Sequence, residues 1–266
     1  MRKVFRHEHN RDYWDRRWTE AGRDRPGFEN LDVYPVKYAE MALRDDTRPG
    51  PVLEIGAGLG RVVKHYRAQG VPMLGIERSL VAVQSMVHPQ NNEAPVPACQ
   101  ADALALPFGE GQFRAVLAFG LYHNFETGLE TGLAEAARVL RPGGRFCISM
   151  RPDNLEMRLN ERYWRWKNRK HKGPRDRFHK LLVAEREFKH LLATHDLATE
   201  SLHRARNVSI LYRFPFLRLR GRDESENRSR GYRLNLAGRI LDTILTTLFP
   251  ASFCNVLVYV GRKEGA

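Results

Sequence analysis

Val52-Leu-Glu-Ile-Gly-Ala-Gly-Leu-Gly-Arg61 is the segment from which the architecture of this chain is inferred. Residues 52–55 form a short apolar run, which is typical of a buried parallel strand. Glycines follow at every second position, and residues 61–69 have the pattern of a helix that ends at Gly70. A strand, a tight glycine turn and a helix suit a nucleotide, because glycine lets the backbone approach a ligand and the helix start offers unpaired N–H groups.

The spacing of the glycines indicates which nucleotide this turn suits. A dinucleotide-binding turn needs the pattern G-x-G-x-x-G, and Arg61 stands where the last of these glycines would be. The pattern therefore disfavours NAD. With Glu54 two residues before the first glycine, the segment resembles motif I of the class I S-adenosylmethionine-dependent methyltransferases. The resemblance implies that Glu54 and four residues of the turn contact this cofactor; those four are Gly56, Ala57, Gly58 and Gly60. Glu54 has a structural alternative, in which it accepts hydrogen bonds from backbone amides of the loop.

Two acidic residues downstream extend the resemblance. Glu77 follows the apolar segment 73–76 and lies 21 residues after the first glycine, where a carboxylate can accept hydrogen bonds from both ribose hydroxyls. Asp102-Ala103 resembles the family's loop after the third strand, in which an Asp receives the adenine amino group. We expect Arg78, Ala103 and Phe119 to line the same cofactor site.

The remaining strands complete an expected α/β fold. Residues 113–119 predict a fourth strand, and the segment 139–144, Val-Leu-Arg-Pro-Gly-Gly, resembles the family's turn before its fifth strand. Pro142 and Gly143 suit the central positions of a type II turn. The resemblance implies a Rossmann-like, doubly wound, seven-stranded sheet whose last strand, expected at 253–261, is antiparallel.

The segment after the fourth strand is where members of this family place the reacting centre. Here it contains Tyr122, His123 and Asn124, at the carboxyl end of a strand in an open α/β sheet. His123 is a candidate general base toward an acceptor, since imidazole titrates near neutral pH, and Tyr122 and Asn124 are candidates for orienting that acceptor. His123 has two alternative roles, as a packing residue or as a residue on the cofactor side. In many relatives the methyl transfer needs little beyond alignment of the acceptor.

Other motifs narrow the class of acceptor. The Asn/Asp-Pro-Pro-Tyr motif of methyltransferases that act on adenine or glutamine is absent, and so is a Pro-Cys nucleophile for attack on pyrimidines. Asp153-Asn154 resembles a pair found in metal-dependent catechol-type O-methyltransferases. That family also needs an Asp after its fourth strand, where this chain has Phe119-Gly120, so no metal site is expected.

Charge divides the chain into unequal parts. We expect a helical lid at 1–49, the cofactor-binding core at 50–150, and basic substrate-recognition insertions with the final strands at 151–266. The core has equal numbers of acidic and basic residues, whereas residues 151–266 hold +12 of the net charge of +13. This asymmetry favours an anionic or amphipathic small molecule, a membrane surface or nucleic acid as the partner of that half. The alternative is a solvated basic face.

Aromatic residues mark the lid and the insertions. Tyr13, Trp14 and Trp18 are candidates for a lid over the cofactor, or else for core packing. Residues 158–180 and 212–220 alternate aromatic and basic side chains, which suits stacking on bases, an anionic pocket or a lipid interface. Residues 234–248 predict an amphipathic helix, whose apolar face we expect to pack on the sheet rather than to contact a membrane.

Cysteine content and the N-terminus bear on the compartment. Cys99, Cys147 and Cys254 are too few and too widely spaced for a disulfide framework or a zinc site. Because no apolar stretch of signal-peptide length is seen, we expect a cytoplasmic protein. The resemblance to class I methyltransferases implies methyl transfer from S-adenosylmethionine, and we expect the acceptor to be an oxygen or nitrogen of a small molecule. Two alternatives stay open: a nucleic-acid methyltransferase or binding protein, and a membrane-associated enzyme acting on a lipid or quinone.

Overall fold

The computed structural model describes residues 1–6, 34–44, 48–89, 94–169, 177–205, 208–219 and 234–265. The predicted lid residues Tyr13, Trp14 and Trp18 lie outside these ranges. No helix in the described ranges is long and apolar enough to cross a bilayer.

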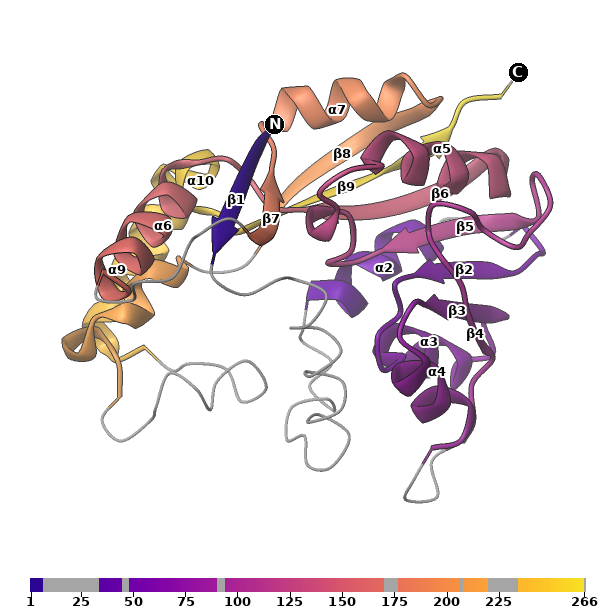
Figure 1. Ribbon diagram of the computed structural model, residues 1–266, viewed down its shortest axis with the longest axis horizontal. Coiled ribbons are helices and arrows are strands. Elements are labelled where there is room, and N and C mark those ends of the chain that lie inside the picture. The colour runs from indigo at the N-terminus through magenta and orange to yellow at the C-terminus, as the bar shows by residue number, and fades with distance from the viewer. Residues whose placement is uncertain are drawn as a thin grey trace.

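A seven-stranded sheet forms the centre of the molecule (Figure 1). Its strand order is β4-β3-β2-β5-β6-β9-β8. The strands are β2 (Val52–Ile55), β3 (Met73–Glu77), β4 (Ala98–Gln100), β5 (Phe113–Ala118), β6 (Leu140–Met150), β8 (Leu197–Ala205) and β9 (Val256–Lys263). The first five of these run parallel, and β9 is antiparallel to both β6 and β8. The predicted Rossmann-like sheet with an antiparallel last strand is confirmed.

Helices cover both faces of this sheet. On one face, α2 (Tyr34–Leu43), α3 (Arg61–Arg67) and α4 (Leu80–Val87) bury an apolar cluster that includes Ala39, Val63 and Met86. On the other face, α5 (Leu129–Val139) and α7 (Glu185–Ala193) bury a larger cluster, in which Leu133 and Phe188 are fully buried. The central strands β2 and β5 are buried along their whole length because both of their faces are covered, and most of their residues are apolar.

The turn before β6 has the backbone that its sequence predicts. Gly143 has a φ of +68°, which is the left-handed conformation needed at the second central position of a type II turn. The strand itself is longer than expected, because β6 already pairs at Leu140 with Phe113 and resumes at Arg145 opposite Ala115. The turn is therefore an irregularity within the strand.

A smaller lobe lies beside the carboxyl end of β6 (Figure 1). It contains α6 (Leu155–Lys167), the 3-10 helices η2 (Ser209–Arg213) and η3 (Pro215–Leu217), α9 (Leu236–Leu248) and α10 (Pro250–Phe253). Its own apolar cluster includes Ile210, Leu211, Leu217 and Leu234, with Leu245 packed against them. A two-stranded antiparallel ribbon of β1 (Arg2–Arg6) and β7 (Arg177–Leu182), which the sequence did not predict, accompanies the lobe.

The expectation that α9 packs its apolar face on the sheet is wrong. Four apolar residues on one side of the helix, Leu236, Ile240, Ile244 and Leu248, are 45–70% exposed. The helix instead rests on η3 and α10 through its other side. Helical periodicity identified the apolar face but does not determine which way it turns.

Candidate active site

The segments that carry the predicted cofactor residues end at one edge of the sheet (Figure 1). The order of the strands reverses at β2, which lies between β3 on one side and β5 on the other. In an open α/β sheet this reversal opens a crevice outside the carboxyl ends of the strands. The glycine turn follows β2, Glu77 ends β3, Asp102 follows β4 and His123 follows β5, so all four meet at this edge.

The glycine turn has a left-handed backbone. The φ angles of Gly56, Gly58 and Gly60 are 73°, 58° and 75°. A Cβ atom on Gly56 would come within 2.9 Å of the Leu121 side chain, and one on Gly60 within 2.7 Å of Met86 Sδ. Glycine is therefore required here by the backbone conformation and also by close packing against the loop after β5 and against α4.

Glu77 is oriented toward the glycine turn by backbone donors. Gly58 N donates to its Oε2 at 3.0 Å, and the N–H groups of Arg78 and Ser79 donate to Oε1 at 2.8 and 3.2 Å. A carboxylate oxygen has two lone pairs, so the Glu77 carboxylate can still accept hydrogen bonds from a pair of hydroxyls. Arg78 helps to orient the Glu77 carboxylate through its backbone N–H, while its side chain is exposed.

The loop that carries Asp102 is tied to the end of β3. Ala101 N donates to the Glu77 carbonyl oxygen at 3.2 Å. Asp102 itself is exposed, and its Oδ1 accepts a hydrogen bond from Leu104 N at 3.0 Å, whereas Ala103 is buried. The carboxylates of Asp102 and Glu77 thus follow neighbouring strands, with the backbone between them fixed.

Glu54 lies beneath the turn rather than in the crevice. Its side chain is 3% exposed, and it accepts a hydrogen bond from Val63 N at the start of α3. Burial raises the pKa of Glu54 to about 8, against the lowering effect of that hydrogen bond. This placement favours the structural alternative, in which Glu54 supports the backbone around the turn.

The backbone after β5 is fixed around Gly120. Gly120 has a φ of +70°; its N–H donates to Ser149 Oγ at 2.9 Å, and Asn124 Nδ2 donates to its carbonyl oxygen at 2.6 Å. A Cβ atom on Gly120 would lie 3.8 Å from both His123 Cε1 and the Tyr34 hydroxyl. His123 and Tyr34 therefore flank the same point of the crevice.

An aromatic pair borders this point. The rings of Tyr34 and Phe119 meet edge to face, with their centroids 6.2 Å apart. Phe119, His123 and Tyr34 are all half-buried, so each has a surface that a bound molecule can contact. Sequence reasoning missed Tyr34 and Ser149, because their approach to Gly120 depends on the packing of α2 and β6.

Tyr122 does not reach the crevice. Its side chain is fully buried in the cluster beneath α5, and its hydroxyl donates to the Gly132 carbonyl oxygen at 3.2 Å. Burial raises the pKa of this phenol well above its usual range. The predicted contact between Tyr122 and an acceptor is therefore wrong. In η1 (Tyr122–Asn124), the tyrosine points into the core and His123 faces the crevice side.

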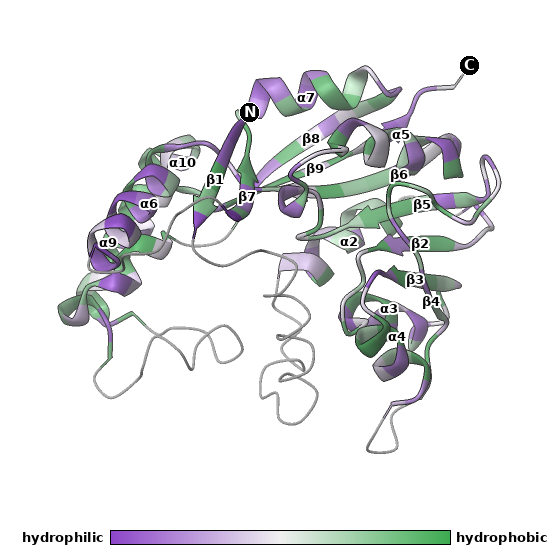
Figure 2. Ribbon diagram, in the orientation of Figure 1, coloured by the Kyte–Doolittle hydropathy of each residue, from purple (hydrophilic) through white to green (hydrophobic). Residues whose placement is uncertain are grey.

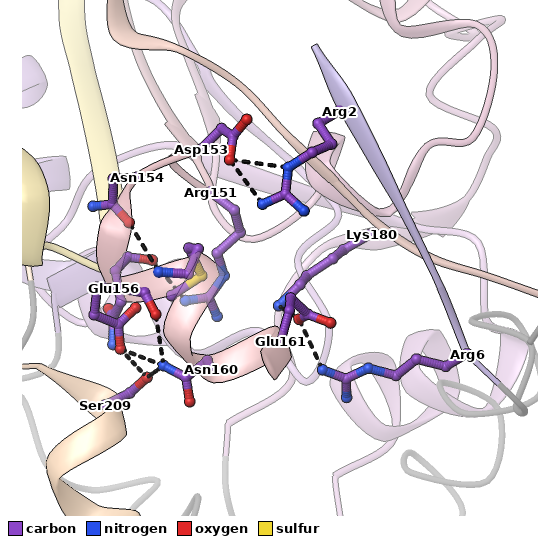
Figure 3. A network of polar contacts seen from close by, with 12 residues as sticks. Arg2, Arg6, Arg151, Asp153, Asn154, Glu156, Asn160, Glu161, Lys180 and Ser209 are labelled. Atoms are coloured by element: carbon purple, nitrogen blue, oxygen red, sulfur yellow. Dashed lines mark hydrogen bonds and ion pairs between the residues drawn. The ribbon is translucent and has the colours of Figure 1, made fainter. Parts of the chain in front are cut away.

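Ion pairs attach the ribbon to α6 beside the crevice (Figure 3). Glu161 Oε1 lies 3.0 Å from Arg6 Nη2 and 2.9 Å from Lys180 Nζ. Burial lowers the pKa of Lys180 to about 8, and Glu161 opposes that change. The ribbon lies close to the site because β7 also packs against η1.

Asp153 and Asn154 have structural partners at the start of α6 (Figure 3). Asp153 Oδ1 accepts from Arg2 Nη2 at 2.7 Å. Asn154 caps the helix by accepting from Met157 N at 3.0 Å, and its Nδ2 donates to the Cys254 carbonyl oxygen at 2.8 Å. Within the described ranges, no group of three or more His, Cys, Asp or Glu side chains is placed to hold a metal ion.

The acceptors at the crevice fit an adenosine group. Glu77 offers carboxylate oxygens for a pair of hydroxyls, and Asp102 offers one for an amino group, at the ends of adjacent strands. The left-handed glycine turn lies between them and the aromatic pair. These residues therefore suit S-adenosylmethionine, the cofactor that the sequence motifs predicted.

Comparisons with known proteins agree with this geometry. Residues 53–148 match the family model described as a methyltransferase domain. The chain is 34% identical over 107 residues to demethylmenaquinone methyltransferase from Corynebacterium kroppenstedtii, and 36% identical over 112 residues to the enzyme of the same name from Thermus thermophilus. These matches cover 40% and 38% of this chain, and 44% and 46% of the relatives. The chain thus spans less than half the length of the curated relatives that it matches.

A solved structure supports the fold over most of the chain. The 1,6-didemethyltoxoflavin-N1-methyltransferase of Burkholderia thailandensis, solved with S-adenosylhomocysteine, superposes with a TM-score of 0.56 at 17% identity. The superposition covers 96% of this chain and 87% of that one. Together, the sheet topology and the family match show that residues 53–148 form a methyltransferase domain of the class I S-adenosylmethionine-dependent type.

Proposed function

We propose that this protein transfers a methyl group from S-adenosylmethionine to an amphipathic small molecule, at an oxygen or nitrogen atom. The observation that carries the proposal is the Glu77 carboxylate, which Gly58 N holds against the glycine turn at the point where the strand order reverses. A carboxylate fixed in this position is suited to a ribose diol.

Each residue at the crevice has a role in this proposal. Glu77 accepts hydrogen bonds from the ribose hydroxyls, and Asp102 accepts one from the adenine amino group. When bound, S-adenosylmethionine supplies a methyl group on a positively charged sulfur. His123 takes the proton that an acceptor hydroxyl or amine loses as its bond to the methyl carbon forms. Alignment of the acceptor with the methyl group lowers the remaining activation barrier, as in other reactions between two bound molecules.

The surroundings of His123 support an amphipathic acceptor. Tyr34 and Phe119 offer ring surfaces, while His123 offers a polar atom beside them. An acceptor with an aromatic or apolar body and one nucleophilic atom matches this combination. The relatives named demethylmenaquinone methyltransferase support a quinone-type molecule as the amphipathic acceptor. Because another relative is named a ubiquinone/menaquinone biosynthesis C-methyltransferase, a ring carbon is the alternative methylated atom for an acceptor of this type.

A nucleic-acid acceptor has less support. Cations from three elements contact the Trp164 ring of α6: Arg6 of β1, Lys167 of α6 and Arg213 of η2 lie 4.9–5.4 Å from its centre. A ring contacted in this way is a poor platform for stacking on a base. Contacts within the protein thus account for basic residues beside the aromatic Trp164 in this part of the chain.

A transfer assay with labelled S-adenosylmethionine tests the proposal. The acceptors are a demethylated quinol, a soluble catechol carrying a carboxylate, and a mixed RNA. We expect label in one or both small molecules and none in RNA. Label in RNA alone would contradict the proposal, as would no transfer to any of the small molecules by protein that binds the cofactor.

A further inference from the structure

The helix α9 presents its apolar side to the surroundings. Leu236, Ile240, Ile244 and Leu248 recur every four residues, so they form one row along the helix. Their exposed fractions are 70%, 52%, 45% and 65%. A helix that packs by its apolar face would bury such a row.

The contacts on the other side of α9 fix this orientation. Gly238 is buried, and a Cβ atom there would collide with the Leu217 carbonyl oxygen. Asp242 Oδ1 accepts a hydrogen bond from Val208 N at 2.7 Å. Gly238 and Asp242 make these inward contacts. Rotating the helix to bury the apolar row would therefore break the close packing at Gly238 and the hydrogen bond of Asp242.

The apolar row continues onto neighbouring segments. Asn235, which caps α9, also donates to the Phe216 carbonyl oxygen, and this places η3 at the start of the helix. Phe216 is 72% exposed, and Phe249, just after the helix, is 55% exposed. We call the combined surface the α9 patch, made of Phe216, Leu236, Ile240, Ile244, Leu248 and Phe249. Figure 2 shows that the segments of this lobe contain apolar residues.

The charges of the lobe are sorted by exposure. Arg158, Arg162, Arg165, Lys167 and Arg169 of α6 and its end are exposed, as is Arg239 of α9. The acids of the same segments turn inward: Glu156 is fully buried against Ser209 and Ile210 N, Glu161 pairs with Lys180, and Asp242 bonds to Val208 N. Among the described residues of α6, η2, η3, α9 and α10, no acidic side chain is exposed.

We propose that the α9 patch docks on the surface of an anionic phospholipid membrane. Apolar residues in a row suit insertion between lipid headgroups, and the exposed cations of the same lobe suit the negative surface around them. The helix has 13 residues, too few to span a bilayer, so it lies in the plane of the interface. A second copy of the chain fits less well, because a symmetric contact between two such lobes would bring like charges together.

Vesicle flotation with the full chain tests this proposal. The wild-type protein is mixed with vesicles of phosphatidylcholine and phosphatidylglycerol, or of phosphatidylcholine alone. We expect flotation with the anionic vesicles and much less with the neutral ones. The variant Ile240→Gln/Ile244→Gln keeps good helix formers at two exposed positions. Its affinity for the anionic vesicles should be at least about tenfold lower than that of the wild type.

Two matched variants control for loss of apolar surface and of charge. Leu80→Gln/Val81→Gln removes two exposed apolar residues from α4, outside the patch, and should float like the wild type. Arg162→Gln/Arg239→Gln should reduce binding, whereas Arg186→Gln/Lys189→Gln on α7 should not. Equal flotation of the wild type and the α9 variant would overturn the proposal. So would a concentration-dependent dimer that the α9 variant abolishes without any vesicle binding by the wild type.

Discussion

Glu54 and Glu77 belong to neighbouring strands but have different structural environments. Glu54 points beneath the glycine turn, where it is buried and bonded to Val63 N. Glu77 ends its strand at the crevice and is bonded to Gly58 N. The sequence motifs predicted that Glu77 meets the ribose hydroxyls, but they left open whether Glu54 contacts the cofactor or supports the loop. Burial separates them, because only Glu77 can also meet a ligand.

The buried position of Glu54 predicts a pH dependence of stability. Its pKa is raised by burial from 4.5 to about 8 in the folded protein. Between these values the folded state keeps a proton that the unfolded state releases, so the free energy of unfolding falls as pH rises. Glu54→Gln, which is always neutral, should remove this fall, so its stability relative to the wild type should rise by about 1.4 kcal/mol per pH unit within the window.

Urea unfolding of both proteins at several pH values measures this difference. Above the folded pKa of about 8, the difference should become constant, since Glu54 is then ionised in both states. A difference that does not change with pH across the window would contradict the buried, proton-binding role of Glu54.

The adjacent residues Tyr122 and His123 should respond differently to substitution. Tyr122→Phe removes one hydrogen bond to Gly132 and should cost about 1 kcal/mol of stability without changing the rate of methyl transfer. His123→Ala should leave cofactor affinity unchanged and lower the transfer rate by about 100-fold or more, if its imidazole is the base. Unfolding and single-turnover assays on both variants check this; a slow Tyr122→Phe enzyme that is otherwise stable would contradict the placement of Tyr122.

The connection between α6 and the ribbon depends on a few charged side chains. Glu161 is the common partner of Arg6 on β1 and Lys180 on β7. Glu156, from the same helix, accepts hydrogen bonds from Ser209 Oγ and Ile210 N of η2. The inward face of α6 therefore holds the ribbon and the lobe together through polar contacts.

Removal of Glu161 should weaken this connection. Glu161→Ala leaves Arg6 and Lys180 close together with no carboxylate between them, and should lower the free energy of unfolding by about 2 kcal/mol, less than for a fully buried pair because both cations keep some exposure. Glu130→Ala, at an exposed position of α5, is the matched control and should cost far less. Equal losses in the two variants, measured by urea unfolding, would show that the ion pairs contribute nothing specific.

The sequence predicted the elements of the core better than those of the lobe. The apolar runs of β2, β3 and β5 and the glycine turn are local patterns, and the structure has them where they were expected. The β1–β7 ribbon pairs residues 2–6 with residues 177–182, and no local pattern announces a contact across that separation. The orientation of α9 could likewise not be predicted from the periodicity of its apolar residues. Gly238 and Asp242 determine that orientation through contacts with other segments.

The molecule combines a charge-balanced cofactor half with a basic second half. In the cofactor half, motif spacing predicted that Glu77, Asp102 and the glycine turn would meet, because parallel strands bring their carboxyl ends to one edge. The acceptor side could not be predicted in the same way. Tyr34, Ser149 and β7 come from distant parts of the chain, and their approach to Gly120 and η1 depends on the packing of whole elements.

Calorimetric titration of the purified protein with S-adenosylmethionine and S-adenosylhomocysteine, with NAD as the control ligand, tests the central claim most directly. We expect both sulfur-containing ligands to bind and NAD not to bind. Glu77→Gln should weaken binding about tenfold or more, while Glu110→Gln, an exposed residue before β5, should not. Failure of both ligands to bind the wild-type protein, or unchanged affinity in Glu77→Gln, would contradict the assignment of this crevice as the cofactor site.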